Sequence, residues 1–266
     1  MKKLLLGTAN NIPENISKVK LWHNSFKKVC DGDVMLIVPG LTEEDKKLLG
    51  NIPHTRVKPP EGTTVNNDRL VNQEHYLRLH LNDYDVVLVT DVFDVVFLKN
   101  PFINFELDRY DLYFAAEGVL HREEPWNNDV LVKSFPEEVS YLQDKEIICS
   151  GVIAGKPLYV SNLLGLMWMK CVLSEGHDIR DQAALNILYY EKENPFFLRE
   201  RTKLYNINDN WCLHCAVGGA TQFFEEWGFK SILTKRYKVP EYKDYAIVHQ
   251  FNRIPTWEKE LQKYGS

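Results

Sequence analysis

The apolar positions of this chain follow two alternating patterns, and the alternation predicts an α/β fold. Continuous runs of aliphatic and β-branched residues are typical of buried strands. In the first half such runs are Lys3–Leu6, Val34–Val38 and Val86–Val89. Helical signals lie between them, at Ile16–Val29, in a short helix opened by the capping-box-like sequence Thr42–Asp45, and at Asn67–Leu81. This order predicts a mostly parallel sheet with helices on both faces.

The second half has a more mixed pattern. Strands are predicted at Asp111–Ala116, Ser150–Gly155, Lys203–Tyr205, Ser231–Leu233 and Ala246–Val248. Helices are predicted at Pro157–Leu173 and Asp181–Tyr190, and a polar loop at Glu123–Asn128. Since no segment rich in Gly, Pro or Ser divides the chain, we expect a single α/β domain over residues 1–266.

Composition narrows the class of function. The 266 residues are 44% hydrophobic and 26% charged, which is ordinary for a globular protein with a sizeable core. The formal net charge of −5 argues against nucleic acid as a partner, because phosphate neutralisation needs a surplus of Lys and Arg. It leaves room for one nucleotide in a pocket.

Targeting signals and cysteine pairs are not evident. The apolar run after Lys3 is too short for a signal peptide, and no run is long enough to span a membrane, so we expect a cytoplasmic protein. The five cysteines are odd in number and irregularly spaced, which argues against a disulfide framework. The segment Trp211–Cys215 resembles half of a zinc site, but buried thiols are the favoured interpretation.

Two carboxylates are the most informative chemical feature. Asp91 and Asp94 directly follow the apolar strand Val86–Val89. Ligands in open α/β sheets bind at the carboxyl ends of strands. Two carboxylates there suit a divalent cation, which in turn suits a phosphate. The alternative is that these residues only form a turn or cap a helix.

A histidine and an arginine extend this candidate site. His249 ends a short apolar strand and is a candidate third ligand, and Arg253 is a candidate partner of a diphosphate. An imidazole beside two carboxylates suits Mn²⁺ better than Mg²⁺. The alternatives are a structural histidine and a solvated surface arginine.

Further candidates each have an alternative structural role. Ser150 and Gly151 offer close approach of a substrate to the backbone, or else a tight turn. Asp181 and Gln182 offer polar groups to a sugar, or else Asp181 caps a helix. Arg69 offers a cation near the nucleotide, or else lies on a solvated helix face.

Taken in order, these motifs resemble those of GT-A type glycosyltransferases, which use nucleotide-sugar donors. The similarity extends to the glycosyltransferase domain of procollagen lysyl hydroxylase-type enzymes and to small bacterial and viral glycosyltransferases. It spans Thr8 to Arg253 and rests on Val89–Phe97, Phe114–Glu117, Cys149–Gly155, Asp181–Gln182, Tyr205–Asn208 and Val248–Asn252. One departure is Cys149, where many relatives have Asn.

The resemblance implies a role for each matching residue. Asp91, Asp94 and His249 would ligate Mn²⁺, with Mg²⁺ as the alternative. The other matching residues would contact the donor and acceptor. Thr8 and Ala9 would contact the base and ribose, and Arg69, Asp91 and Arg253 would contact the nucleotide diphosphate. Glu117, Ser150, Gly151 and Asn208 would contact the substrates, and Asp181 and Gln182 would lie at the donor sugar and its reacting carbon. Residues 1–100 would form a nucleotide-binding half and residues 101–266 an acceptor and sugar half of one Rossmann-like domain.

The implied activity is transfer of a sugar from a nucleotide diphosphate, a UDP-sugar, to a hydroxyl of a glycan or other acceptor, with retention at the anomeric carbon. An inverting enzyme would need an acceptor-side carboxylate, for which Glu117, Glu123, Glu124 and Asp129 are available. The alternatives are a metal-dependent phosphohydrolase, a nucleotidyltransferase acting on nucleotide-sugars, and a non-catalytic carbohydrate-binding module.

Overall fold

Ten strands form two sheets in the part of the chain that the computed structural model describes, residues 1–57, 64–191, 199–215 and 241–265. The larger sheet has seven strands in the order β3-β2-β1-β4-β7-β6-β8, and the smaller has three in the order β5-β10-β9. Their bounds are β1 Lys3–Thr8, β2 Asp33–Pro39, β3 His54–Val57, β4 Val86–Thr90, β5 Val95–Phe97, β6 Leu112–Leu120, β7 Glu146–Gly155, β8 Thr202–Tyr205, β9 Cys212–His214 and β10 Ile247–His249.

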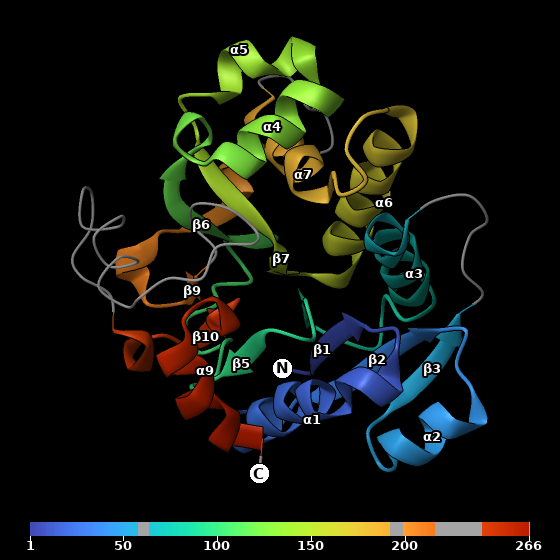
Figure 1. Cartoon of the computed structure of the whole chain (residues 1–266). Helices are drawn as coiled ribbons and strands as arrows, with labels where there is room; N and C mark the ends of the chain where they lie inside the picture. The colour runs from blue at the N-terminus through green and yellow to red at the C-terminus, as the bar shows by residue number, and fades with distance from the viewer. Residues whose placement is uncertain (58–63, 192–198, 216–240, 266) are drawn as a thin grey trace.

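Helices cover the larger sheet and connect its strands (Figure 1). The α-helices are α1 Ile12–Val29, α2 Glu43–Leu49, α3 Val65–Leu79, α4 Pro125–Ser134, α5 Val139–Leu142, α6 Pro157–Leu173, α7 Asp181–Tyr190 and α9 Pro255–Leu261. Short 3-10 helices are η1 His121–Glu123, η2 Pro136–Glu138, η3 Arg199–Arg201, η4 Ile207–Asp209, η5 Tyr242–Asp244, η6 Phe251–Arg253 and η7 Gln262–Gly265.

The larger sheet is mostly parallel, as the sequence predicts. Strands β3, β2, β1 and β4 pair in parallel, and β6 pairs in parallel with β8. Strand β7 lies antiparallel between β4 and β6. One continuous sheet therefore joins strands from residues 1–100 to strands from residues 101–266, and it confirms the α/β, Rossmann-like architecture.

The core forms on both faces of this sheet because side chains alternate along each strand. In β1, Leu5 packs into the cluster that contains Trp22 of α1. The neighbouring Leu4 packs into the opposite cluster, which contains Leu70 of α3 and Met167 of α6. All five side chains are almost fully buried. The central strands are therefore covered on both sides, and their carboxyl ends are left as the place where a ligand can bind.

Several local predictions need correction. The polar loop predicted at Glu123–Asn128 is wrong from Pro125 onward, where α4 begins. The Glu124 carboxylate accepts a hydrogen bond from the Asn127 amide and caps this helix, with proline favourable in its first turn. The cap role considered for Asp181 is also wrong, since α7 begins at Asp181 and Arg180 occupies the cap position. The strand predicted at Ser231–Leu233 lies outside the described residues.

Within the described ranges, no helix combines the length and apolar character needed to cross a bilayer.

Candidate active site

The site begins where β4 ends. Thr90, the last residue of the strand, accepts a hydrogen bond of 2.8 Å from the indole nitrogen of Trp22. The next residue, Asp91, donates its backbone N–H to the Gly151 carbonyl of β7 at 2.9 Å. These two bonds fix the Thr90 side chain and the Asp91 backbone, so the Asp91 side chain projects from a fixed point at the edge of the sheet.

The smaller sheet brings His249 to the same place. Strand β5 begins one residue after Asp94, and its first residue, Val95, pairs with His249 in the antiparallel register of β10. The backbone N–H of Gln250 donates to the backbone carbonyl of Asp94 at 2.7 Å. Strand register thus holds Asp94 and His249 side by side, although they lie more than 150 positions apart in the sequence.

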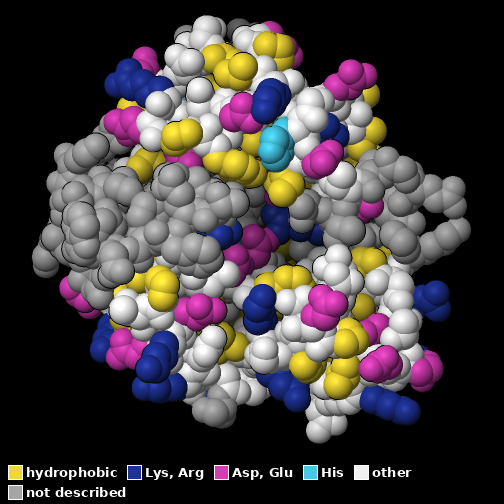
Figure 2. Space-filling view, in the orientation of Figure 1, with side chains coloured by type: hydrophobic (Ala, Val, Ile, Leu, Met, Phe, Trp, Pro, Cys, Tyr) yellow, Lys and Arg dark blue, Asp and Glu magenta, His cyan; other side chains and the backbone are white. Residues whose placement is uncertain are grey.

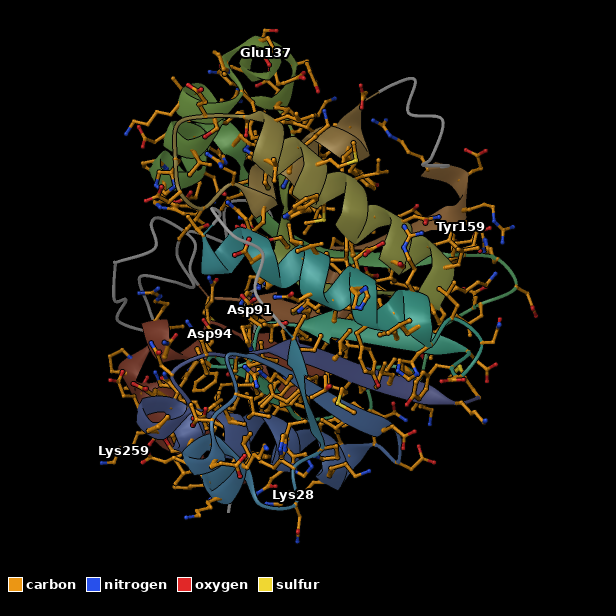
Figure 3. All side chains as sticks on the ribbon, turned by 90° about the vertical axis from the view of Figure 1, so that its right-hand side faces the viewer. Lys28, Asp91, Asp94, Glu137, Tyr159 and Lys259 are labelled. Atoms are coloured by element: carbon orange, nitrogen blue, oxygen red, sulfur yellow. The ribbon has the colours of Figure 1, made fainter. Side chains whose placement is uncertain are left out.

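Asp91, Asp94 and His249 converge closely enough to hold one cation. His249 Nε2 lies 3.2 Å from Asp91 Oδ2 and 3.7 Å from Asp94 Oδ1. One ligand atom from each of the three lies within 4.8 Å of the other two. Figure 3 shows Asp91 and Asp94 together beneath α3, far from peripheral side chains such as Glu137 and Lys28. Burial lowers the pKa of His249, which favours the neutral imidazole that a metal ligand requires.

The space beside these three residues depends on Gly151. A Cβ at this position would lie 2.4 Å from Cε1 of His249 and 2.7 Å from Oδ2 of Asp91. Any larger residue would therefore displace two of the three candidate ligands. Two carboxylates, one imidazole and a neighbouring glycine fit a Mn²⁺ ion, which accepts oxygen and imidazole ligands together.

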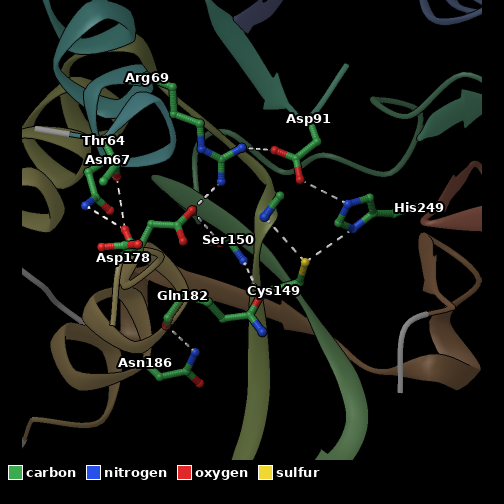
Figure 4. Close-up of polar contacts among 12 residues, drawn as sticks. Thr64, Asn67, Arg69, Asp91, Cys149, Ser150, Asp178, Gln182, Asn186 and His249 are labelled. Atoms are coloured by element: carbon green, nitrogen blue, oxygen red, sulfur yellow. Dashed lines mark hydrogen bonds and ion pairs between the residues drawn. The ribbon is translucent and has the colours of Figure 1, made fainter. Parts of the chain in front are cut away.

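Arg69 links this group to α7. Its guanidinium pairs with Asp91 (Figure 4) and also with Asp181. Asp181, which is 3% exposed, also accepts a hydrogen bond of 3.1 Å from the Ser150 hydroxyl. The buried Asp181 carboxylate is therefore held by one cation and one hydroxyl, as buried charges require.

A second polar network continues along the cavity wall from Ser150. Gln182 accepts a hydrogen bond from the Ser150 amide at 3.2 Å and donates one to Asn127 at 2.7 Å. Asn127 donates to Oε2 of Glu124 through its backbone and its side chain, at 2.6 and 2.7 Å. Among the described residues, Oε1 of Glu124 is buried and has no hydrogen-bond partner. A ligand hydroxyl would satisfy this oxygen.

Glu117 contributes a fully buried carboxyl group to the cavity. Burial, together with the negative charge of Glu124, raises the pKa of Glu117 to about 7. Near neutral pH this side chain is therefore divided between its protonated and ionised forms. A protonated carboxyl can donate a hydrogen bond to a substrate oxygen, and an ionised one can accept from a hydroxyl.

These groups surround one cavity of about 390 Å³. Figure 2 shows a hollow in this face with acidic and basic side chains gathered at it. All the predicted site residues except Asn208 line the cavity: Thr8, Ala9, Arg69, Asp91, Asp94, Glu117, Ser150, Gly151, Asp181, Gln182, His249 and Arg253. Asn208 lies exposed in η4 and is not brought to this group.

The sequence analysis missed part of the lining. Trp126 and Asn127 also face the cavity, but they lie in the segment that was predicted to be a loop. The pair Glu124–Pro125 was the available signal, since a capping residue followed by proline is typical of a helix start. Cys149, whose role the sequence left open, lies in the wall next to His249.

Comparison with known proteins supports the fold. No protein-family model and no curated protein sequence matches this chain. Among solved structures, it is similar to WbbM, described as a bifunctional glycosyltransferase in its apo structure, with a TM-score of 0.58 and 13% sequence identity. The match covers 99% of this chain and 51% of that chain, so this chain spans about half the length of WbbM. The chain therefore has a fold that is also found in a glycosyltransferase.

The raised pKa of Glu117 predicts a pH-dependent cost to stability. Between about pH 4.5, the ordinary value, and about pH 7, the folded state retains a proton that the unfolded state has released. Glu117 should therefore contribute a fall in the free energy of unfolding as pH rises through this window, by up to about 1.4 kcal/mol per pH unit. Buried histidines such as His249, whose pKa is lowered, contribute in the opposite direction in wild type and variant alike. In urea denaturation with chelator, the slope of the unfolding free energy against pH should therefore be more negative in wild type than in Glu117→Gln. Equal slopes would contradict the assignment.

Proposed function

We propose that this chain is a metal-dependent GT-A type glycosyltransferase that moves a sugar from a UDP-sugar to a hydroxyl of a glycan or other acceptor. The observation that carries the proposal is the convergence of Asp91, Asp94 and His249 in the wall of a polar cavity at the carboxyl end of β4. The fold similarity to a glycosyltransferase supports the same class.

The leaving group of such a reaction is a diphosphate, whose developing negative charge must be stabilised. Bound Mn²⁺ would supply Lewis-acid stabilisation of that charge, with Asp91, Asp94 and His249 as its ligands. Arg253 also lines the cavity and would place a guanidinium near the diphosphate. Thr8 and Ala9, at the end of β1, would contact the base and ribose.

The part of the cavity wall that α7 and α4 supply suits a sugar. Asp181 and Gln182 stand at the first turn of α7, and their hydrogen bonds to Ser150 and Asn127 restrict their orientations. Preorganised polar groups of this kind orient hydroxyls and stabilise positive charge at an anomeric carbon. Trp126, half-buried in the same wall, offers an apolar surface for a sugar ring. We propose transfer with retention, which needs no strong base on the acceptor side.

Turnover should depend on the metal ligands. It is measured in a screen of nucleotide-sugars with Mn²⁺, in which the released UDP, GDP or CDP is the readout. Replacing Asp94 with Asn weakens one candidate ligand with little change in volume, so turnover should fall by about 10²-fold or more while the melting temperature is retained. Asp108→Asn, at an exposed position, is the matched control and should behave as wild type. Wild-type turnover by Asp94→Asn would refute the metal assignment.

The product of the same screen separates the competing classes of function. A glycosyltransferase that also hydrolyses its donor releases the nucleoside diphosphate. A phosphohydrolase that cleaves the diphosphate releases the nucleoside monophosphate and a sugar phosphate instead. A carbohydrate-binding module releases neither. Release of UMP rather than UDP would therefore favour the phosphohydrolase.

The second prediction concerns Asp181. Because Arg180 occupies the cap position of α7, a change of Asp181 to Asn removes no helix cap, and Asn can still accept from Ser150. We expect kcat to fall by about 10²-fold or more, equivalent to about 2.7 kcal/mol of transition-state stabilisation. Melting temperature and UDP binding should change little. A normal kcat would leave Asp181 with a structural role as the partner of Arg69.

The third prediction concerns the nucleotide. Calorimetry with UDP, GDP and CDP in the presence of Mn²⁺ should give the tightest binding for UDP, because the families that this chain resembles mostly use UDP. If GDP binds more tightly than UDP, the choice of donor is wrong, although the fold and the metal site would still stand.

A further inference from the structure

His249 has a second face that the metal site does not use. Its Nε2 points to Asp91 and Asp94, whereas its Nδ1 lies 3.0 Å from Nδ1 of His214. The two histidines are paired in register by the parallel strands β9 and β10, and each is 1% exposed. The contact is therefore between two buried imidazoles held by the backbone of one sheet.

We propose that His214 positions His249 for metal binding by accepting the hydrogen on its Nδ1. The inference rests on the metal site of the proposed function and assigns a role to a residue that lies behind that site. His214 is a positioning residue in this scheme, because it does not line the cavity.

The number of hydrogens on the two rings limits which nitrogen can donate. A neutral imidazole carries one N–H, so of two nitrogens 3.0 Å apart one donates and the other accepts. When His249 donates from Nδ1, the lone pair of its Nε2 faces Asp91 and Asp94 and is available to a cation. When His214 donates instead, the hydrogen of His249 lies on Nε2 and points at the carboxylates. Metal binding therefore requires His214 to accept.

The surroundings of His214 leave it able to accept. In the part of the chain that the structure describes, its other nitrogen, Nε2, is buried and has no hydrogen-bond partner. No second contact therefore fixes which nitrogen of His214 carries the hydrogen, and the ring can adopt the form that His249 needs.

Cys149 is the competing partner of His249. Its Sγ lies 3.3 Å from the same Nδ1 (Figure 4), but a thiol is a weaker acceptor than an imidazole nitrogen. Cys149, His214 and His249 also form a buried group of one sulfur and two nitrogen donors, whose atoms lie within 4.8 Å of one another. That donor set would suit Zn²⁺ if His214 were itself a ligand, so the test must separate the two roles.

The test compares Mn²⁺ affinity, measured by EPR titration without nucleotide, in wild type, His214→Leu and His214→Asn. Loss of an outer hydrogen-bond partner typically costs 10- to 100-fold in metal affinity, so we expect about that loss in His214→Leu. The Asn amide can still accept a hydrogen bond, so His214→Asn should remain within about threefold of wild type. His121→Leu is the matched control, because it also removes a histidine that is 1% exposed and should leave the affinity unchanged.

Three results would overturn the inference: wild-type Mn²⁺ affinity in His214→Leu, an equal loss in both His214 variants, or a loss confined to Zn²⁺ titrated in parallel. Absence of Mn²⁺ binding by the wild-type protein would instead refute the metal site of the proposed function. Thermal melting with chelator checks that each variant folds.

A measurement on the wild-type protein removes the dependence on variants. Long-range ¹H–¹⁵N NMR reports which nitrogen of each histidine carries the hydrogen, and it is recorded with UDP and Mg²⁺, the diamagnetic alternative to Mn²⁺ at this site. We expect it on Nδ1 of His249 and on Nε2 of His214. A hydrogen on Nε2 of His249 in the loaded protein would overturn the inference.

Discussion

Repulsion among carboxylates in one cavity is the constraint on which the rest of the site depends. Asp91, Asp94, Asp181, Glu117 and Glu124 all line the same space. The protein offsets this repulsion by pairing two of them with Arg69, by raising the pKa of Glu117 and by capping α4 with Glu124. A cation bound by Asp91 and Asp94 would neutralise the remaining negative charge of these carboxylates. Such a cation would in turn attract a diphosphate.

Strand pairing fixes the positions of the residues around Asp91 and Asp94. The antiparallel strand β7 places Gly151 beside Asp91, and the pairing of β5 with β10 places His249 beside Asp94. Each contact joins segments distant in sequence, so the site exists only when both sheets are formed. The same β4–β7 pairing joins residues 1–100 to residues 101–266, whose assignment as nucleotide and sugar halves remains a prediction.

The sequence predicts those features whose signal is local. The apolar run Val86–Val89 and the two following carboxylates were sufficient to locate the end of β4, because a buried parallel strand needs a continuous apolar run. The pairing of His214 with His249 was not predictable, since β9 and β10 have three residues each and their register depends on distant contacts. Trp126 escapes prediction for another reason: its segment is polar and predicts a loop, whereas the structure begins α4 there.

The metal site is tested most directly by anomalous diffraction at the manganese edge from crystals grown with Mn²⁺ and UDP. We expect one strong peak within coordination distance of Asp91, Asp94 and His249, in contact with the UDP diphosphate. A peak elsewhere in the molecule, or UDP bound away from these three residues, would contradict it.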